Sequence, residues 1–467
     1  MMKRWMYIVG SVFLTVNLMA CGSNYVKVDL GEKLESGVVQ EKTESQEKME
    51  SREKTESQEK IEGQETSQPY VVIKNDSVEG KLSQNEKAGP GVTKSEVDEA
   101  NQEQGADLEH ESQLEDDSWM SQQSPSYVDV LIDVETCREK RIYAKKAENQ
   151  EEISLVFAGD ILFDDSYAIM SAMKQRGKGI EGSISAELLG EMRNADIFMV
   201  NNEFPYTDRG TPQAGKTYTF RAKPQSASYL KDMGADLVSL ANNHVFDYGE
   251  VSLTDSIDTL NAIDMPYVGA GRNIEEASSP VYYIVNDKKI AFLSATQIER
   301  LATPDTKGAT ETTPGVFRCL DNTRLLKQIR EVKEKCDYLV VYIHWGTEGT
   351  EVPDHWQLEQ APQMAEAGAD LIIGDHPHVL QPITYIGNVP VVYSLGNYLF
   401  NSKTRDTCLV KVVLGKDGLK TLQFIPAVQK SSSVQAVSGE EKDRILQYMR
   451  SISGQIVIDG DGYMTPR

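Results

Sequence analysis

Histidine, carboxylate and amide side chains occur in this sequence in combinations that bind divalent cations. Four of the six histidines directly follow apolar, β-branched segments, namely His244, His344, His376 and His378, whereas His110 and His355 do not. Asp160, Glu203 and Asn243 follow other such segments. Imidazole nitrogens, carboxylates and amide oxygens are common ligands of zinc, manganese and iron. The sequence therefore predicts a site for one or two divalent metal ions.

Each polar cluster also has a simpler explanation when it is considered alone. A single histidine after a strand is more often a hydrogen-bonded structural residue, and Asn242-Asn243-His244 could cap a following helix. Six such clusters are harder to explain as caps. Pro377 fixes the turn between His376 and His378, so both rings could face one metal ion. None of the five cysteines lies in these clusters, which excludes a thiolate site.

The segments that must position these residues alternate between two patterns. Short apolar runs predict strands at residues 154–158, 197–201, 237–240, 289–294, 338–343, 371–373 and 391–394. Amphipathic patterns predict helices at residues 185–194, 227–233, 251–263, 324–335 and 357–367. Apolar strands separated by helices indicate an α/β domain whose mainly parallel sheet is covered on both faces. Since functional groups gather at the carboxyl ends of such strands, we expect the polar clusters to meet there.

Six motifs in this order resemble one known family. They are FAGDILF, VNNEFPYTDRG, SLANNHVFDYG, YIHWGTE, GADLIIGDHPHVLQP and YSLGNYLF, and the resemblance spans about residues 154–400. They are similar to the CapA family of poly-γ-glutamate capsule biosynthesis. That resemblance implies a metallophosphoesterase-like layered α/β sandwich.

The resemblance also implies roles for individual residues. Asp160 matches the first metal-ligand motif and Glu203 the second. Asn243 matches a ligand amide, and His244 matches an imidazole that acts as an acid. The remaining ligand histidines are matched by His344, His376 and His378. Asp247, three residues after His244, would lie on the same face of a helical turn and could orient its ring as a second catalytic residue.

Two departures from the general metallophosphoesterase pattern concern the number of metal ions. The first motif of those enzymes is Asp-x-His, whereas Asp160 is followed by Ile161 and Leu162. Their second motif usually has an aspartate that bridges two metals, and this chain has Glu203. Either one or two ions therefore remain possible.

Several nearby residues have two interpretations each. Asp164 or Asp165 could supply the missing carboxylate, or could cap the next segment. Asn397 could lie behind the ligands or could be a turn residue after Gly396. Trp345 and Tyr248 could line the pocket, although burial in the core is the commoner role of aromatic residues.

The amino terminus predicts sorting to the cell envelope. Lys3 and Arg4 precede a short apolar stretch, which is followed by Leu18-Met19-Ala20-Cys21. This order describes a signal peptide over residues 1–20, and Leu-x-Ala-Cys resembles the bacterial lipobox, in which the cysteine carries lipid. We expect Cys21 to anchor the protein on the extracytoplasmic face of the membrane. An ordinary signal peptide with a chance cysteine is the alternative.

Residues 21–150 predict a spacer of low complexity, rich in Glu, Lys, Gln and Ser. The octapeptide at residues 41–48 recurs unchanged at residues 53–60. Such a segment buries too little apolar area to fold, so we expect a lipidated, acidic and disordered tether. A coiled coil is the alternative, but the repeat lacks apolar heptad positions. The folded domain is expected at residues 151–430, with an extension at 431–467.

The charge of the chain excludes some partners and leaves three functions open. A formal net charge of −24 argues against nucleic acid. The first function is capsule formation with hydrolase or transferase chemistry, in contact with poly-γ-glutamate synthase subunits and the polymer. The second is a non-catalytic metal-binding subunit of a polymer synthesis or export complex, which the acidic charge disfavours because holding polyglutamate by charge needs a basic groove. The third is a phosphoesterase for an envelope phosphate.

Overall fold

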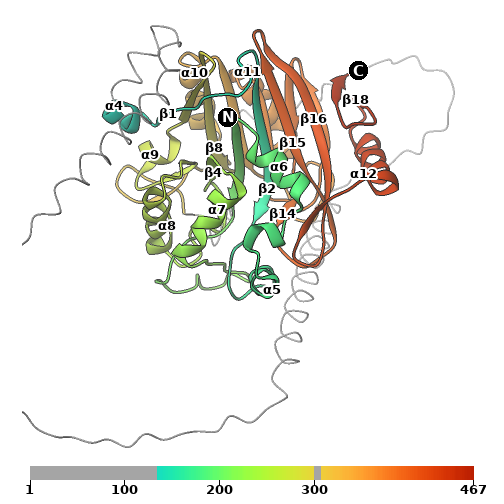
Figure 1. Cartoon of the computed structure of the whole chain (residues 1–467). Coiled ribbons are helices and arrows are strands. Elements are labelled where there is room, and N and C mark those ends of the chain that lie inside the picture. The colour runs from blue at the N-terminus through green and yellow to red at the C-terminus, as the bar shows by residue number, and fades with distance from the viewer. Residues whose placement is uncertain (1–133, 299–306) are drawn as a thin grey trace, which may run out of the picture. The chain divides into compact units, whose positions relative to one another are not determined.

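The computed structural model describes residues 134–298 and 307–467, which fold around two β-sheets (Figure 1). The first sheet has the order β1-β7-β8-β10-β11-β13-β12. Its strands are β1 (Ile142–Ala144), β7 (Val281–Val285), β8 (Lys288–Thr296), β10 (Tyr338–His344), β11 (Leu371–Asp375), β12 (Ile383–Ile386) and β13 (Val389–Val392).

The second sheet has the order β17-β16-β15-β2-β3-β4-β5, and β14 also pairs with β2. Its strands are β2 (Ile153–Ile161), β3 (Ile197–Asn202), β4 (Leu237–Ser239), β5 (Tyr267–Val268), β14 (Asn397–Leu399), β15 (Arg405–Gly415), β16 (Gly418–Gln429) and β17 (Val434–Ala436). Two small pairs complete the strands: β6 (Ala270–Gly271) with β9 (Gly315–Val316), and β18 (Ile456–Ile458) with β19 (Met464–Pro466).

Helices connect the strands of both sheets. They are α4 (Val134–Glu139), α5 (Ala168–Arg176), α6 (Ala186–Arg193), α7 (Ser228–Met233), α8 (Glu250–Ala262), α9 (Ile274–Ser278), α10 (Thr323–Lys333), α11 (His355–Ala367) and α12 (Gly439–Ile452), with 3₁₀ turns η2 (Gly179–Gly182) and η3 (Pro224–Ala227). The capping box of α11 illustrates a local start signal, because Oδ1 of Asp354 accepts from Gln357 N and Oε1 of Gln357 accepts from Asp354 N.

The two sheets pack face to face and are covered by helices on their outer faces. Along β2, Leu155 and Phe157 face the first sheet and share a core with Tyr342 of β10. Val156 between them faces outward and packs in the core that includes Leu188 of α6. Successive side chains of a strand point to opposite faces, so a strand buried on both faces is apolar throughout. The result is a layered sandwich.

The predicted α/β class is confirmed, and the predicted strands and helices are present. The strands belong to two sheets, however, not to one. Both sheets are parallel at their centres, where β2-β3-β4 and β8-β10-β11 lie. Antiparallel strands flank these centres, including the long β15-β16 hairpin. Periodicity along the chain does not say which sheet a strand joins, which explains the difference.

Residues on both sides of the predicted domain, 151–430, contact the two sheets. Composition predicts a tether that reaches residue 150, but β1 pairs with β7 within the first sheet. Its three residues are too few to give a pattern in the sequence. At the other end, the sequence predicts an extension at residues 431–467. These residues include α12 and β18, which lie beside β15 and β16 (Figure 1), and Phe424 N donates to Gly462 O at 2.8 Å.

Several predictions fall outside the described residues, namely the signal peptide, the lipidation of Cys21 and the repeat at residues 41–60. Within residues 134–298 and 307–467, no helix is both long enough and apolar enough to cross a membrane.

Candidate metal centre

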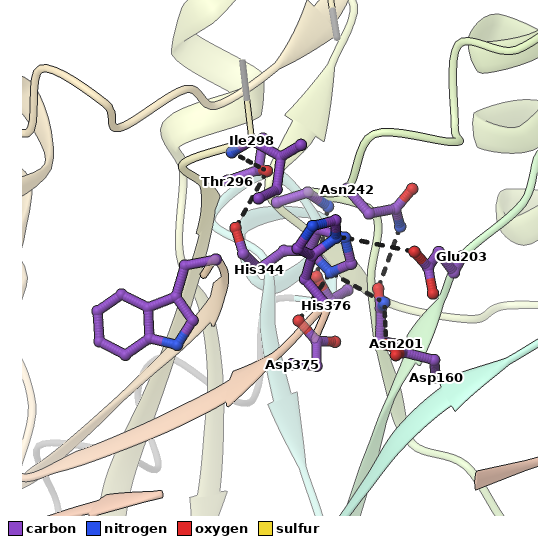
Figure 2. Close-up of polar contacts among 12 residues, drawn as sticks. Asp160, Asn201, Glu203, Asn242, Thr296, Ile298, His344, Asp375 and His376 are labelled. Carbon is purple, nitrogen blue, oxygen red and sulfur yellow. Dashed lines mark hydrogen bonds and ion pairs between the residues drawn. The ribbon is translucent and has the colours of Figure 1, made fainter. Parts of the chain in front are cut away.

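The polar residues after the strands meet where the carboxyl ends of both sheets lie together. Asp160 of β2 lies opposite Asn201 of β3 in the second sheet, and Glu203 follows β3. In the first sheet, His344 at the end of β10 pairs with Asp375 at the end of β11. Figure 2 shows these side chains gathered around His344. The site is therefore built by two sheets together.

Three overlapping groups of side chains could each hold a metal ion. They are Glu203 with His344 and His376, Asp160 with His344 and Asp375, and Asp160 with Glu203 and His378. Within each group the ligand atoms lie within 4.8 Å of one another. Because the groups share members, they could hold one ion or two neighbouring ions.

His344 is the centre of the hydrogen-bond network. Its Nδ1 lies 2.8 Å from Oδ1 of Asp375, and its Nε2 lies 2.8 Å from Oδ1 of Asn243. The same Nε2 is 3.1 Å from Nδ1 of His376 and 3.4 Å from Oε1 of Glu203. A carboxylate on one ring nitrogen orients the other nitrogen toward a metal in many metalloproteins. This geometry fits His344 as a ligand through Nε2.

His378 and Asp160 form a second part of the network. Nδ1 of His378 lies 2.9 Å from Oδ2 of Asp160, while Asn201 donates to Oδ1 of Asp160 at 2.9 Å. Burial opposes charge on both partners, but their hydrogen bond and mutual attraction prevail. The pKa of Asp160 is accordingly lowered, and the pKa of His378 is raised well above its ordinary value, first by the charge of Glu203 and then by the hydrogen bond to Asp160.

Three buried carboxylate oxygens at the site lack a hydrogen-bond donor, which indicates whether a cation would fit there. Both carboxylate oxygens of Glu203 and Oδ2 of Asp375 are buried and accept no hydrogen bond from the part of the chain that the structure describes. A buried ionised carboxylate is costly unless a positive partner is near. A cation ligated by these oxygens would supply that partner, so the donor set fits a divalent metal ion.

Burial sets the protonation of the ligands. It raises the pKa of Glu203 and of Asp375 well above their ordinary values, and the charge of Asp160 adds to the effect. Burial also lowers the pKa of His344 well below its ordinary value and that of His376 to about 4. Neutral imidazole is the form that binds metal. Both histidines are therefore in the binding form at neutral pH.

The turn that carries two of the histidines has an unfavourable backbone. His376 has φ 93° and His378 has φ 56°, in the left-handed region that non-glycine residues seldom occupy. Each such residue costs on the order of 1–3 kcal/mol. Gly349 N donates to Pro377 O at 2.8 Å and helps to hold the turn. The fold thus maintains a strained conformation where it presents ligands.

His244 lies beside the ligands and is engaged by Asp247 as predicted. Nδ1 of His244 is 2.7 Å from Oδ2 of Asp247. The ring of Phe220 packs against the imidazole with centroids 4.2 Å apart. Burial lowers the pKa of His244, although the charge of Asp247 opposes this. Since Nδ1 is occupied, Nε2 is the nitrogen left for a reacting group.

The two spare aspartates do not join the site. Asp164 accepts hydrogen bonds from Ser166 N at 2.8 Å and from Arg221 N at 2.8 Å, which is the role of a turn residue. Asp165 forms ion pairs with Lys174 and Lys223. Neither aspartate belongs to the candidate ligand groups, and neither caps α5, whose first turn has no side-chain cap.

The structure also decides between the two interpretations of Asn397 and of Trp345, and it shows the contact of Tyr248. Asn397 of β14 lies opposite Asp160, and its Oδ1 is buried with no hydrogen bond from the described residues, which favours a place behind the ligands. Trp345 is fully buried and donates Nε1 to Tyr393 O at 2.9 Å, so it belongs to the core. The ring of Tyr248 carries the guanidinium of Arg221 at 4.5 Å from its centroid.

Sequence reasoning missed other residues of the site. Asp375 and Asn201 are in the quoted motifs but carry no predicted role. Asn242 shapes the turn before His244, because its Oδ1 accepts from the main-chain N of His244 and of Val245, both at 3.0 Å. Glu348 lies 3.4 Å from Nε2 of His378. The position of Asp375 at a strand end was a usable signal, and Glu348 is the last residue of the quoted motif YIHWGTE.

Comparison with known families agrees with this geometry. A family model described as "Bacterial capsule synthesis protein PGA_cap" matches residues 154–402, more than half of the chain. This chain belongs to the PGA_cap family. All of the candidate ligands, from Asp160 to His378, lie within the range that the PGA_cap model matches.

Curated relatives of this PGA_cap protein include two from Bacillus. The chain is 29% identical to the capsule biosynthesis protein CapA of Bacillus anthracis, over 67% of this chain and 76% of the relative. It is 33% identical to the PGA biosynthesis protein CapA of Bacillus subtilis, over 60% of this chain and 73% of the relative. A Mycobacterium tuberculosis relative, 23% identical over 57% of this chain and 75% of its own length, is described as a probable polyglutamine synthesis accessory protein.

Among solved structures, the protein TT1561 of Thermus thermophilus aligns with 57% of this chain and 97% of its own. The TM-score is 0.33 and the identity is 10%, so this similarity supports no conclusion about function.

Proposed function

We propose that this chain takes part in forming a poly-γ-glutamate capsule, as a metal-dependent protein with hydrolase or transferase chemistry. Membership of the PGA_cap family supports the capsule role, as do the names of the two Bacillus relatives. One observation carries the chemical part of the proposal. Buried carboxylate oxygens that lack hydrogen bonds from the described residues lie beside His344 and His376, which are neutral at pH 7.

Each residue has a defined task in this proposal. Six residues bind one or two ions of manganese, zinc or iron, namely Asp160, Glu203, Asn243, His344, His376 and His378. Asp375 holds Nδ1 of His344 and can join them through its other oxygen. A metal ion in this set would lower the pKa of water and polarise an electrophilic oxygen.

The residues around His244 handle the proton. In its imidazolium form, His244 donates the Nε2 proton to the leaving group and is left as the neutral ring whose Nδ1–H Asp247 holds. Phe220 packs on the ring and limits the approach of water from that side. A γ-glutamyl amide is the substrate bond that fits a capsule role, because its nitrogen needs a proton in order to leave.

Variants that separate metal binding from chemistry test this function. His376→Ala should lower both bound metal and stability, because the ion stabilises only the folded form. His244→Asn should keep its metal and lose turnover on the order of 10²–10⁴-fold. Bound metal is measured by elemental analysis, and turnover on γ-glutamyl and phosphodiester substrates. His355→Ala, at the exposed start of α11, is the matched control.

The accessory role of the mycobacterial relative gives the second candidate. In that case the metal centre would hold a carboxylate of the polymer or a synthase subunit without reacting. A His244→Asn variant that keeps its metal and supports normal polymer production would establish this candidate and exclude catalysis. Turnover restricted to phosphodiesters would identify a phosphoesterase instead.

Anchoring through lipid on Cys21, on the extracytoplasmic face of the membrane, is part of the same proposal. The sequence Leu-Met-Ala-Cys at residues 18–21 supports it. Cys21→Ala should release the protein from the membrane fraction, which immunoblotting of fractionated cells would detect. Unchanged retention of this variant would contradict lipid attachment.

A further inference from the structure

A buried lysine lies behind the His244–Asp247 pair. The side chain of Lys216 is 5% exposed, and its Nζ is 2.6 Å from Oδ1 of Asp247, whose side chain is fully buried. Nζ also donates to the main-chain oxygen of Asn243. A buried ammonium group needs partners that replace its hydration. Both partners of Lys216 are close neighbours of His244 in the chain, one directly before it and one three residues after it.

The carboxylate of Asp247 is held at both of its oxygens. Oδ2 lies 2.7 Å from Nδ1 of His244 and accepts from Phe220 N at 2.6 Å. Oδ1 faces Lys216. Rotation of this carboxylate would therefore break contacts on both sides. Lys216 and Phe220 N thus contact the carboxylate of Asp247 in the orientation in which it faces His244.

Lys216 reaches this position from a segment with no helix or strand, residues 207–221. The same segment contributes Phe220, whose ring packs on His244. Gln213 N donates to the main-chain oxygen of Asp247 at 2.8 Å. A bridge hydrogen bond from Thr207 N to Ala222 O at 2.9 Å closes the ends of the segment, and the contacts above attach its middle to the His244 turn.

We propose that Lys216 is a positioning residue, which clamps Asp247 and the main chain of Asn243 so that Nε2 of His244 is directed at the reacting group. The effect on turnover rests on the proposed function, whereas the effect on the His244 ring does not. Methionine at position 216 would keep the length of the side chain and lose both polar contacts. Arginine would keep the charge with a different shape.

Histidine-selective ¹⁵N labelling of the full-length protein tests the clamp, since the chain has only six histidines. His244→Asn assigns the His244 signals, and spectra are recorded with zinc added. Lys216→Met should shift or broaden the Nδ1–H signal of His244, while zinc content stays the same. Turnover should fall on the order of 10- to 100-fold with little change in KM. Lys216→Arg should restore part of both readouts.

Lys223→Met is the matched control, because Lys223 is 60% exposed and pairs with Asp165 at the surface. This variant should behave as the unmodified protein. An unchanged His244 signal in Lys216→Met would overturn the proposal, even if turnover fell. If the unmodified protein turns over no substrate, the proposed function fails while the His244 signal still decides the role of Lys216. If Lys216→Met does not fold, two other variants decide the question. The Nδ1–H signal of His244 should be kept in Lys216→Arg and lost in Lys216→Gln. Equal spectra of these two variants would overturn the proposal.

Discussion

At the scale of single residues, the proposed metal site would make Glu203 favour metal binding at a cost to the stability of the metal-free chain. Its two buried oxygens accept no hydrogen bond from the described residues, so an ionised Glu203 is favourable only beside a cation. The left-handed backbone of His376 and His378 adds a second cost in the same place. Functional sites commonly retain such costs, because removing them removes the function.

Glu203→Gln should therefore stabilise the metal-free protein and weaken metal binding. Burial raises the pKa of Glu203, so the folded state binds more protons than the unfolded state above the ordinary carboxyl pKa. Stability of the metal-free protein should then fall as pH rises through that window. In Glu203→Gln, stability should depend less steeply on pH. The free energy of unfolding at neutral pH should be about 1 kcal/mol or more higher than in the unmodified protein. Urea unfolding in a chelator at several pH values measures the slope, and calorimetry with zinc measures affinity.

Asp375 has a raised pKa for the same reason, so part of the slope should remain in the variant. Glu181→Gln is the control, because Glu181 is 67% exposed and should change neither quantity. If the stability of Glu203→Gln and of the unmodified protein changed equally with pH, ionisation of Glu203 would not destabilise the metal-free protein.

At the scale of elements, β2 is in close contact with the turn before β14, and this contact positions the candidate ligand Asp160. Asp160 N donates to Gly396 O at 3.2 Å. A Cβ added at Gly159 would lie only 1.9 Å from that same oxygen. Gly396 itself has φ 67°, a conformation that glycine adopts without strain. Both glycines therefore allow two backbones to meet directly behind the candidate metal centre.

Gly159→Ala should move the turn away from β2 and destabilise the protein by about 1–3 kcal/mol or more, since the clash is with main chain. Displacement of Asp160 should also lower zinc affinity. Gly190→Ala in α6 is the control, because no atom lies within 4 Å of its Cβ position. That change should stabilise the helix by about 0.5–1 kcal/mol. Thermal unfolding measures the stability of both variants. If Gly159→Ala is as stable as the unmodified protein, the close contact between the two backbones is refuted.

At the scale of the whole molecule, the carboxyl-terminal residues complete the core between the layers. Six of their side chains are buried there, namely Ile445, Leu446, Met449, Ile456, Ile458 and Met464. Burying one such side chain contributes about 1.5–3 kcal/mol. Together they match the total stability of an ordinary domain, about 5–15 kcal/mol.

A fragment that ends at residue 430 should therefore fail to fold, whereas a fragment of residues 134–467 should unfold cooperatively. Circular dichroism and urea titration of the two fragments measure this difference. A fragment of residues 151–467, which lacks β1, is the intermediate case and should be soluble but less stable. Cooperative unfolding of residues 134–430 would restore the boundary that the sequence predicted.

The sequence by itself determined the types of the elements and most of the candidate ligands. Strands such as β10 and helices such as α11 follow from hydrophobic patterns a few residues long. The chemistry of Asp160, Glu203 and His376 is likewise a property of each residue and its position after a strand. These signals are local, so no knowledge of the rest of the chain was needed.

Only the tertiary structure decided which distant residues meet. Pairing of β10 with β11 placed Asp375 against His344, and packing of two sheets brought Asp160 to the same site. Lys216 lies in a segment without periodicity, and its contact with Asp247 depends on how that segment packs against the His244 turn. Contacts of this kind arise from the packing of the whole chain, since each is favourable only when many others have formed.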